Sequence, residues 1–267
     1  MLIIRIAAIA AAVLALCAGF RAYALTAEET SALQRAADRG KLIYAYDQAA
    51  SVATDELQLK NPTAADHYRG GWVVEDRGRT LHVVFYDIST GEPRAYFTAD
   101  VDVGKVVSSH ILTAADDGRL PPLDLRMINA VLIAVRLGQR PCGAAPFNTV
   151  ALPPETPNGA IVVYLLTPQT TAGEYPAGGH YEVDVAADGS VLASRSFTRG
   201  CITLGGKPPT ADSRPAAMFL THLLDPTPTE IHVYLSFLSR EPIFVGTQNP
   251  QRVWEVAGAD IHLVQPK

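Results

Sequence analysis

A pair of cysteines, Cys142 and Cys201, limits the fold of this 267-residue chain more than any other feature. The third cysteine, Cys17, lies in an N-terminal segment that we expect to be removed on export. An exported chain that keeps two cysteines is expected to join them in one disulfide. This bond would close a loop of about 60 residues and destabilise the unfolded chain by on the order of 4 kcal/mol.

The N-terminal segment, residues 1–24, has the pattern of an export signal. Arg5 provides a short positive region, residues 6–20 are apolar or small, and the segment ends in Ala-Tyr-Ala. Small residues at the first and third of these last positions are what a signal peptidase recognises. We therefore expect a removed signal peptide and a mature chain of residues 25–267, in the periplasm or secreted.

Two alternatives to cleavage stay open. The segment could be retained as a membrane anchor, although its uncharged run is shorter than the roughly 20 apolar residues of a membrane span. It could also be lipidated at Cys17, although Leu16 is larger than the residue expected before a lipidated cysteine. Neither alternative changes the expected folded part of the chain.

The charge of the expected mature chain excludes some partners. Without Arg5 and Arg21, 20 basic side chains stand against 27 acidic ones, a net charge of −7. No cluster of Lys and Arg is present, so nucleic acid and anionic membrane surfaces are poor candidates. Hydrophobic residues make up 48% of the whole chain, enough for a sizeable core, and no second apolar run has membrane length. We expect one soluble domain without stable membrane insertion.

The first part of this domain has helical patterns. Thr26 and Glu29 form a capping box, and apolar residues follow at helical spacing. Gly40 predicts the end of this helix. Residues 42–47 are expected to form a short strand or turn that leads into a second helix over residues 48–57.

The remaining chain alternates mainly between strand patterns and turn residues, with two further helical patterns. We expect a buried core helix over residues 125–137, ended by Gly138, and another helix over residues 214–224. Asp188-Gly189 is a strong hairpin signal. The predicted strands are residues 72–76, 81–87, 93–101, 148–154, 161–168, 180–189, 191–198, 230–238, 242–248, 252–258 and 260–265. Together these elements predict an α+β fold of antiparallel hairpins packed with a few helices.

The residues around Cys201 resemble the active-site motif of the L,D-transpeptidases, which crosslink peptidoglycan through a cysteine acyl-enzyme. The matching sequence is Thr-Arg-Gly-Cys-Ile-Thr-Leu, residues 198–204. This resemblance implies that Cys201 is the nucleophile, that His180 is its base and that amides around Gly200 form the oxyanion site. The predicted disulfide and this catalytic role are competing interpretations of the same cysteine.

Departures from the transpeptidase motif favour the disulfide. His180 begins an alternating strand, whereas the family has a glycine after its histidine. Thr203 stands where the family has Arg or Asn. A regular hairpin is expected between His180 and Cys201, where the family has an irregular segment. We therefore keep the cysteine-enzyme interpretation as the alternative.

A second resemblance covers more of the chain. It is similar to uncharacterised exported proteins of Gram-negative bacteria over residues 46–57, 70–75, 142–153, 178–189, 197–201 and 228–236. This similarity implies a periplasmic or secreted location without implying a specific activity. Our first hypothesis is therefore a disulfide-stabilised exported protein with a binding or envelope-associated role and no catalysis.

Other candidate sites are weaker. His222, His232 and His262 could line a metal site, but no pair of histidines has the short spacing of known zinc ligands. Asp47 and Asp55 could form an acid–base pair, with Asp47 also able to cap the predicted second helix. The chain has no P-loop, dinucleotide-binding glycine motif, Gly-x-Ser-x-Gly or haem motif, so we expect no cofactor.

The segment before His180 has two possible roles. Residues 167–179 are rich in glycine and proline and are expected to be a connector or, alternatively, a lid. Gly178 and Gly179 allow a sharp bend before His180. We expect this bend to be a tight strand start with His180 hydrogen-bonded in place, with a functional loop end as the alternative.

Overall fold

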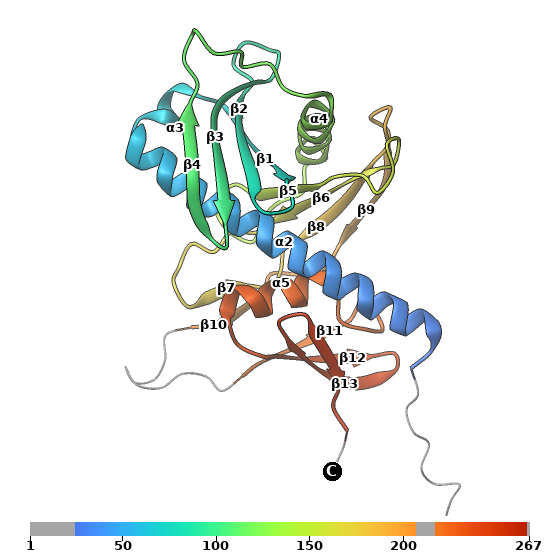
Figure 1. Ribbon diagram of the computed structural model, residues 1–267. Coiled ribbons are helices and arrows are strands. Elements are labelled where there is room, and N and C mark those ends of the chain that lie inside the picture. Colours follow the sequence, from blue (N-terminus) through green and yellow to red (C-terminus); the bar gives the residue numbers. More distant parts are fainter. Residues whose placement is uncertain (1–24, 207–216, 266–267) are drawn as a thin grey trace, which may run out of the picture.

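The computed structural model describes residues 25–206 and 217–265, so the predicted signal peptide lies outside the described residues. Figure 1 shows the arrangement of the helices and strands within these ranges. The helices are α2 (Ala27–Lys60), α3 (Ala64–His67), α4 (Pro122–Arg136) and α5 (Glu230–Ser239). None of the helices in the described ranges combines the length and apolar content needed to cross a membrane.

Within the described residues, three four-stranded sheets form most of the β structure. The first sheet is antiparallel and follows chain order: β1 (Gly70–Asp76), β2 (Leu81–Asp87), β3 (Arg94–Asp102) and β4 (Lys105–Ile111). The second is antiparallel too: β5 (Asn148–Leu152), β6 (Ile161–Leu166), β8 (Tyr181–Val185) and β9 (Val191–Ser196). The third contains β11 (Met218–His222), β12 (Ile243–Gln248), β13 (Gln251–Ala257) and β14 (Asp260–Leu263), with β11 parallel to β12. The predicted α+β class is confirmed.

A separate two-stranded pairing joins β7 (Glu174–Pro176) to β10 (Thr203–Gly205). β7 lies inside the glycine- and proline-rich segment that was expected to be a connector or a lid. β10 begins two residues after Cys201. The pairing fixes this segment to the chain beyond Cys201, as expected for a structured connector.

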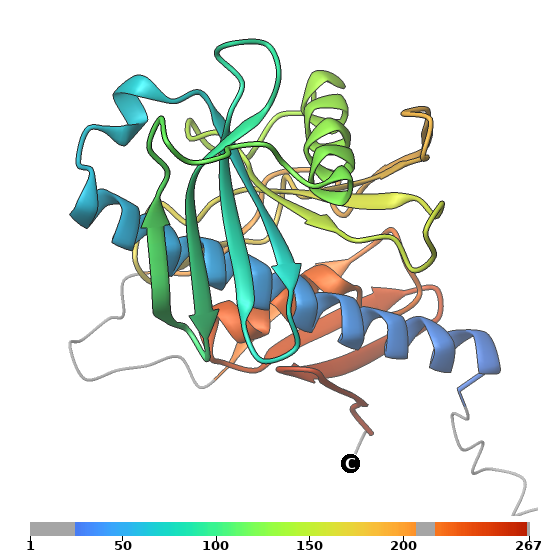
Figure 2. The ribbon, with the colours of Figure 1, turned by 45° about the horizontal axis from the view of Figure 1, so that its top comes forward.

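Helix α2 lies between the sheets and contacts all three of them (Figures 1 and 2). Its 34 residues extend for about 51 Å. The first sheet lies on one side of α2, and α5 with the third sheet lies on the other. One hydrophobic cluster joins residues of α2, α5 and the three sheets, and a second joins α4 to the first and second sheets.

The expectation that Gly40 ends a helix is wrong, because α2 continues without a break from Ala27 to Lys60. Gly40 is buried where α2 crosses α5. A Cβ atom at position 40 would lie 2.5 Å from Cβ of Val233 and 2.6 Å from the carbonyl oxygen of Glu230. The glycine is therefore needed for close helix packing and not for a helix end.

Near the C-terminus, one predicted strand is a helix and one predicted helix is a strand. Residues 230–238, predicted as a strand, belong to α5, which is buried at most positions and so shows no single apolar stripe. Residues 218–222, within the predicted helix 214–224, form β11, whose side chains alternate between buried and exposed. The earlier part of that predicted helix lies outside the described residues.

We expect Gly40→Ala to lower the free energy of unfolding by about 1–3 kcal/mol, because the added methyl group overpacks the contact with α5. Helix propensity alone would predict a gain of up to about 1 kcal/mol. Denaturant-induced unfolding measures the change. Ser51→Ala, at an exposed position of α2, is the matched control and should change stability little. A stabilised Gly40→Ala variant would contradict the observed crossing.

Candidate functional site

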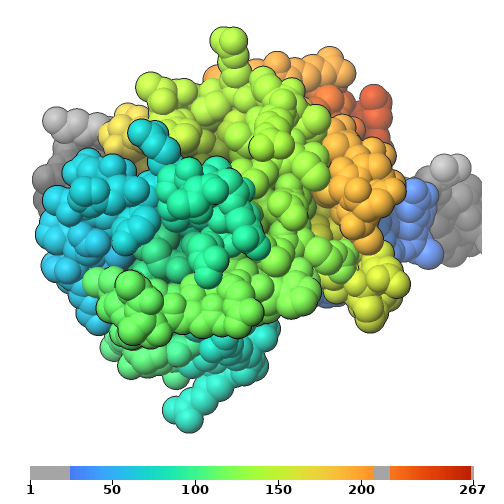
Figure 3. All heavy atoms as spheres, turned by 90° about the horizontal axis from the view of Figure 1, so that it is seen from above, coloured from blue at the N-terminus to red at the C-terminus, as the bar shows by residue number. Residues whose placement is uncertain are grey.

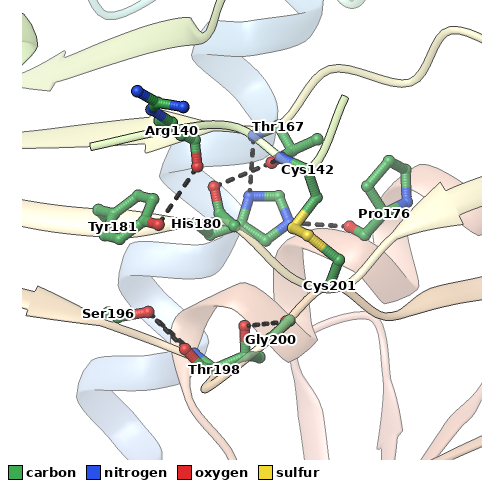
Figure 4. The surroundings of a disulfide bond; sticks show 11 residues. Arg140, Cys142, Thr167, Pro176, His180, Tyr181, Ser196, Thr198, Gly200 and Cys201 are labelled. Carbon is green, nitrogen blue, oxygen red and sulfur yellow. Dashed lines mark hydrogen bonds between the residues drawn. A yellow bond between two sulfur atoms is a disulfide. The ribbon is translucent and has the colours of Figure 1, made fainter. Parts of the chain in front are cut away.

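Cys142 and Cys201 form a disulfide, as predicted, with their Cα atoms 5.4 Å apart (Figure 4). Cys142 lies in the loop that follows α4, and Cys201 lies between β9 and β10. The backbone N–H of Cys142 donates to Oγ1 of Thr167 at 3.1 Å, which links this loop to the end of β6. The disulfide and this hydrogen bond together connect the segments that follow α4, β6 and β9.

His180 is fully buried beside this connection, and both of its ring nitrogens contact the backbone. Nδ1 accepts a hydrogen bond from the backbone N–H of Thr167 at 3.2 Å, and Nε2 donates to the carbonyl oxygen of Pro176 at 2.8 Å (Figure 4). Burial lowers the pKa of His180 to about 4, so the ring is neutral near pH 7. The expected hydrogen-bonded position at the start of β8 is confirmed.

The two glycines before His180 allow the chain to pass directly against the disulfide. A Cβ atom on Gly178 would lie 2.3 Å from the carbonyl oxygen of Gly200. Gly179 has a φ of 71°, and a Cβ atom there would lie 2.7 Å from Sγ of Cys142. These positions require glycine for close packing and, at Gly179, for left-handed backbone.

The residues that resemble the transpeptidase motif are thus close together in the fold, but their contacts differ from those of a catalytic cysteine and its base. Sγ of Cys201 is bonded to Cys142, whereas a cysteine nucleophile needs a free thiolate. The nitrogens of His180 are bonded to backbone groups. The carbonyl oxygen of Gly200 accepts a hydrogen bond from Thr198 Oγ1 at 2.9 Å.

An ion-pair network that sequence reasoning missed is centred on Arg195 of β9. Its Nε donates to Glu182 of β8 at 2.6 Å, and its Nη1 donates to Asp225 at 3.2 Å. Its Nη2 donates to Glu230, the first residue of α5, at 3.0 Å. Burial acts to lower the pKa of Arg195, but the carboxylates of Glu230 and Glu182 raise it well above its ordinary value.

Three further side chains extend the network. Nη1 of Arg39, on α2, donates to Glu182 at 3.0 Å. The hydroxyl of Tyr164, on β6, donates to Glu230 at 3.0 Å. Nε2 of His222 lies 2.8 Å from Asp225 Oδ2. The network, from here on the Arg195 network, therefore connects α2, the second sheet, β11 and α5.

A polar cavity of about 450 Å³ lies beside the Arg195 network, between the first half of α2 and the start of α5. Arg35 and Arg39, four positions apart on α2, both line it, as do Arg195 and Glu230. The charged groups of the network already bond to one another. We conclude that the network is foremost a structural connection.

One contact of this network had a signal in the sequence. Glu182 and Arg195 are opposite residues in the β8–β9 register, so a correctly aligned hairpin places opposite charges side by side. The contacts with Asp225 and Glu230 depend on the position of α5, which the sequence pattern did not identify as a helix.

The histidines considered for metal binding either lie apart from one another or are hydrogen-bonded to protein groups. The rings of His222 and His232 meet edge to face with centroids 4.7 Å apart, whereas His262 lies on β14. Burial lowers the pKa of His232 to about 3, and its Nδ1 accepts from the backbone N–H of Thr229. Within residues 25–206 and 217–265, no three His, Cys, Asp or Glu side chains are grouped to hold a metal ion.

The predicted carboxylate pair on α2 is not brought together. Asp47 is a buried residue in the middle of α2, and its carboxylate accepts hydrogen bonds from Asn148 Nδ2 at 3.0 Å and Tyr234 OH at 3.1 Å. Asp55 is exposed. Asp47 also caps no helix, because α2 begins twenty residues earlier, at Ala27. Its role is to connect α2 with β5 and α5.

A different carboxyl pair, Asp124 and Glu75, lies between α4 and β1. The Asp124 side chain is buried, and neither oxygen contacts an N–H or hydroxyl donor among the described residues. Burial, together with the neighbouring negatively charged carboxylate of Glu75, raises the pKa of Asp124 to about 7. Asp124 is thus protonated in mildly acidic solution.

Comparison of the chain with protein-family models, curated proteins and solved structures gives no match.

We expect Arg195→Met to lower the free energy of unfolding by about 2–4 kcal/mol, because Glu182, Asp225 and Glu230 lose the cation that they share. Chemical denaturation at neutral pH measures the loss. Arg199→Met, at an exposed position of the β9–β10 connection, is the matched control. A loss below about 0.5 kcal/mol, the usual range for surface substitutions, would show that the network contributes little.

Asp124→Asn should stabilise the protein at pH 8 by on the order of 1–2 kcal/mol. In the unfolded chain Asp124 ionises near its ordinary pKa of 3.8, whereas in the folded protein it ionises near 7. Between these values the folded state holds the proton more tightly, so stability falls as pH rises through this window and stays low above it. The variant should show a smaller decline from pH 5 to pH 8.

Unfolding curves across this pH range test the Asp124 prediction. The exposed Asp66→Asn is the control and should keep the wild-type pH dependence. An Asp124→Asn variant with the same decline as wild type would show that Asp124 does not titrate in this range.

Proposed function

We propose that the chain is an exported, disulfide-stabilised protein with a binding or envelope-associated role, and that Cys201 is not a nucleophile. The observation that carries this proposal is the bond between Cys142 and Cys201. The neutral ring of His180, held by Thr167 and Pro176, gives it further support.

Export is supported by the N-terminal segment and by the disulfide together. Residues 1–24 have the charge and apolar pattern of a signal peptide. Disulfides persist in the periplasm and outside the cell, whereas cytosolic thiols are kept reduced. The two features therefore favour a periplasmic or secreted protein.

The structural role of the disulfide is supported by what surrounds it. Gly178 and Gly179 pack against it, and the segment after Cys201 pairs with β7. Breaking the bond would separate the segment after α4 from the segment between β9 and β10. These contacts give the disulfide a role in the fold that needs no catalysis.

The competing function is a cysteine enzyme of the cell wall that resembles the L,D-transpeptidases. It would require reduction of the disulfide and release of the His180 ring from its two backbone partners. The proximity of the His180 segment to Cys201 is the observation that keeps this alternative testable.

We expect no free thiol at Cys142 or Cys201 in protein isolated from the periplasm, denatured without reductant and treated with a thiol-specific reagent. Cys201→Ser should lower the free energy of unfolding by about 2–4 kcal/mol, because the unfolded chain regains the freedom of the closed loop. Thiol labelling with mass spectrometry and denaturant unfolding measure these two results.

His180→Ala is a matched variant for the cysteine-enzyme alternative. Two labelled thiols in wild type, with Cys201 reacting fastest and His180→Ala slowing its reaction, would contradict the proposal. Slower labelling is the signature of an imidazole that activates a thiol.

A further inference from the structure

A cavity with a volume of about 640 Å³ lies along α4. It lies between α4, the β2–β3 connection and the β8–β9 turn. Figure 3 shows this face, with α4 in yellow-green beside the orange β8–β9 hairpin. The volume falls within the roughly 300–1,000 Å³ range of small-molecule sites. We call this cavity the α4 groove.

One face of α4 forms a wall of the α4 groove. Arg126, Asn129, Ile133 and Arg136 all line it and follow one another at intervals of three or four residues. Arg126 and Arg136 are ten residues apart, which places their backbones about 15 Å apart along the helix. The wall therefore has a guanidinium group near each end and a less polar middle.

The middle of the groove is apolar. Ala130 of α4, Ile161 of β6 and Val185 of β8 are buried residues that line it. Ile133 approaches the β8–β9 turn, where a Cβ atom on Gly189 would lie 3.5 Å from Ile133 Cδ1. An elongated apolar group could thus lie along α4 and be removed from water.

The two arginines have no carboxylate partner among the described residues. Arg126 donates from Nη1 to the carbonyl oxygen of Pro157 at 2.6 Å and from Nη2 to that of Gly159 at 2.9 Å. These neutral carbonyls orient the guanidinium but leave its charge unpaired. Asp188, the acidic residue of the lining, accepts hydrogen bonds from Ser190 instead.

We propose that the α4 groove binds a small anionic amphiphile of the long-chain carboxylate class, an inference that rests on the proposed binding role. The carboxylate lies at Arg126, whose guanidinium is already oriented and so loses little freedom on binding. The acyl chain lies along Ala130 and Ile133. Arg136 adds attraction through its charge and covers the chain with its aliphatic stem.

The test is isothermal titration calorimetry of the purified protein with dodecanoate below its micellar concentration. We expect one dodecanoate per chain. Acetate, which has the head without the tail, should not bind detectably. Dodecyltrimethylammonium, which has the same tail with a positive head, should bind at least about tenfold more weakly than dodecanoate.

Variants locate the site. Arg126→Gln should weaken dodecanoate binding by about tenfold or more, because a charge-assisted contact is lost. Ala187→Trp, at an exposed lining position, should block the groove without changing its charge. Arg35→Gln, in the polar cavity beside the Arg195 network, is the matched control and should bind as wild type.

Absence of dodecanoate binding, or binding unchanged in both Arg126→Gln and Ala187→Trp, would overturn the inference. Binding to phosphatidylglycerol vesicles without binding to free dodecanoate would overturn it as well. If dodecanoate fails to bind while both cysteines remain unreactive, the ligand class is wrong but the structural role of the disulfide stands. Reactive cysteines would instead contradict the proposed function.

Discussion

The crossing of α2 and α5 at Gly40 is the contact on which the other elements depend. The first sheet packs on one side of α2, and the third sheet packs beyond α5 on the other. Close approach requires a residue without a side chain at position 40. Two turns further along α2, Asp47 bonds to Tyr234 of α5 and Asn148 of β5, so the same junction is fixed by hydrogen bonds. Burial raises the pKa of Asp47, and the hydrogen bonds from Tyr234 and Asn148 act in the opposite direction by stabilising its charged form.

The Arg195 network and the disulfide fix the second sheet to this junction from different positions. Arg195 connects β9 to the start of α5 and, through Glu182, to Arg39 of α2. The disulfide instead connects the ends of α4 and β9. Both contacts restrain segments that are distant in the sequence, as expected of a rigid scaffold. In such a scaffold, binding surfaces are the grooves that the packed elements leave open, and the α4 groove, with a volume of about 640 Å³, is one of them.

The sequence predicted those elements whose signals are local. Alternation and turn residues identified β1, β2 and β3 of the first sheet and the strands of the second sheet, whereas β4 was not predicted. The cysteine pair identified the disulfide. Gly40 was misinterpreted because a glycine at a helix end and one at a helix crossing have the same local pattern, and only the position of Val233 separates them. Helix α5 was missed because it is buried on most sides and rich in β-branched and aromatic residues. With α5 misassigned, the contacts of Glu230 and the structural role of Asp47 could not be predicted either.

Native-state hydrogen exchange of the α2 amides tests the central claim, that α2 is one continuous core helix held at its middle by α5. The account predicts that amides from Gly40 to Asp47 exchange only through global unfolding, with free energies equal to those of the best-protected core amides. If these amides exchange instead through a local opening of much lower free energy while the flanking turns stay protected, α2 behaves as two helices joined at Gly40. This result would contradict the account.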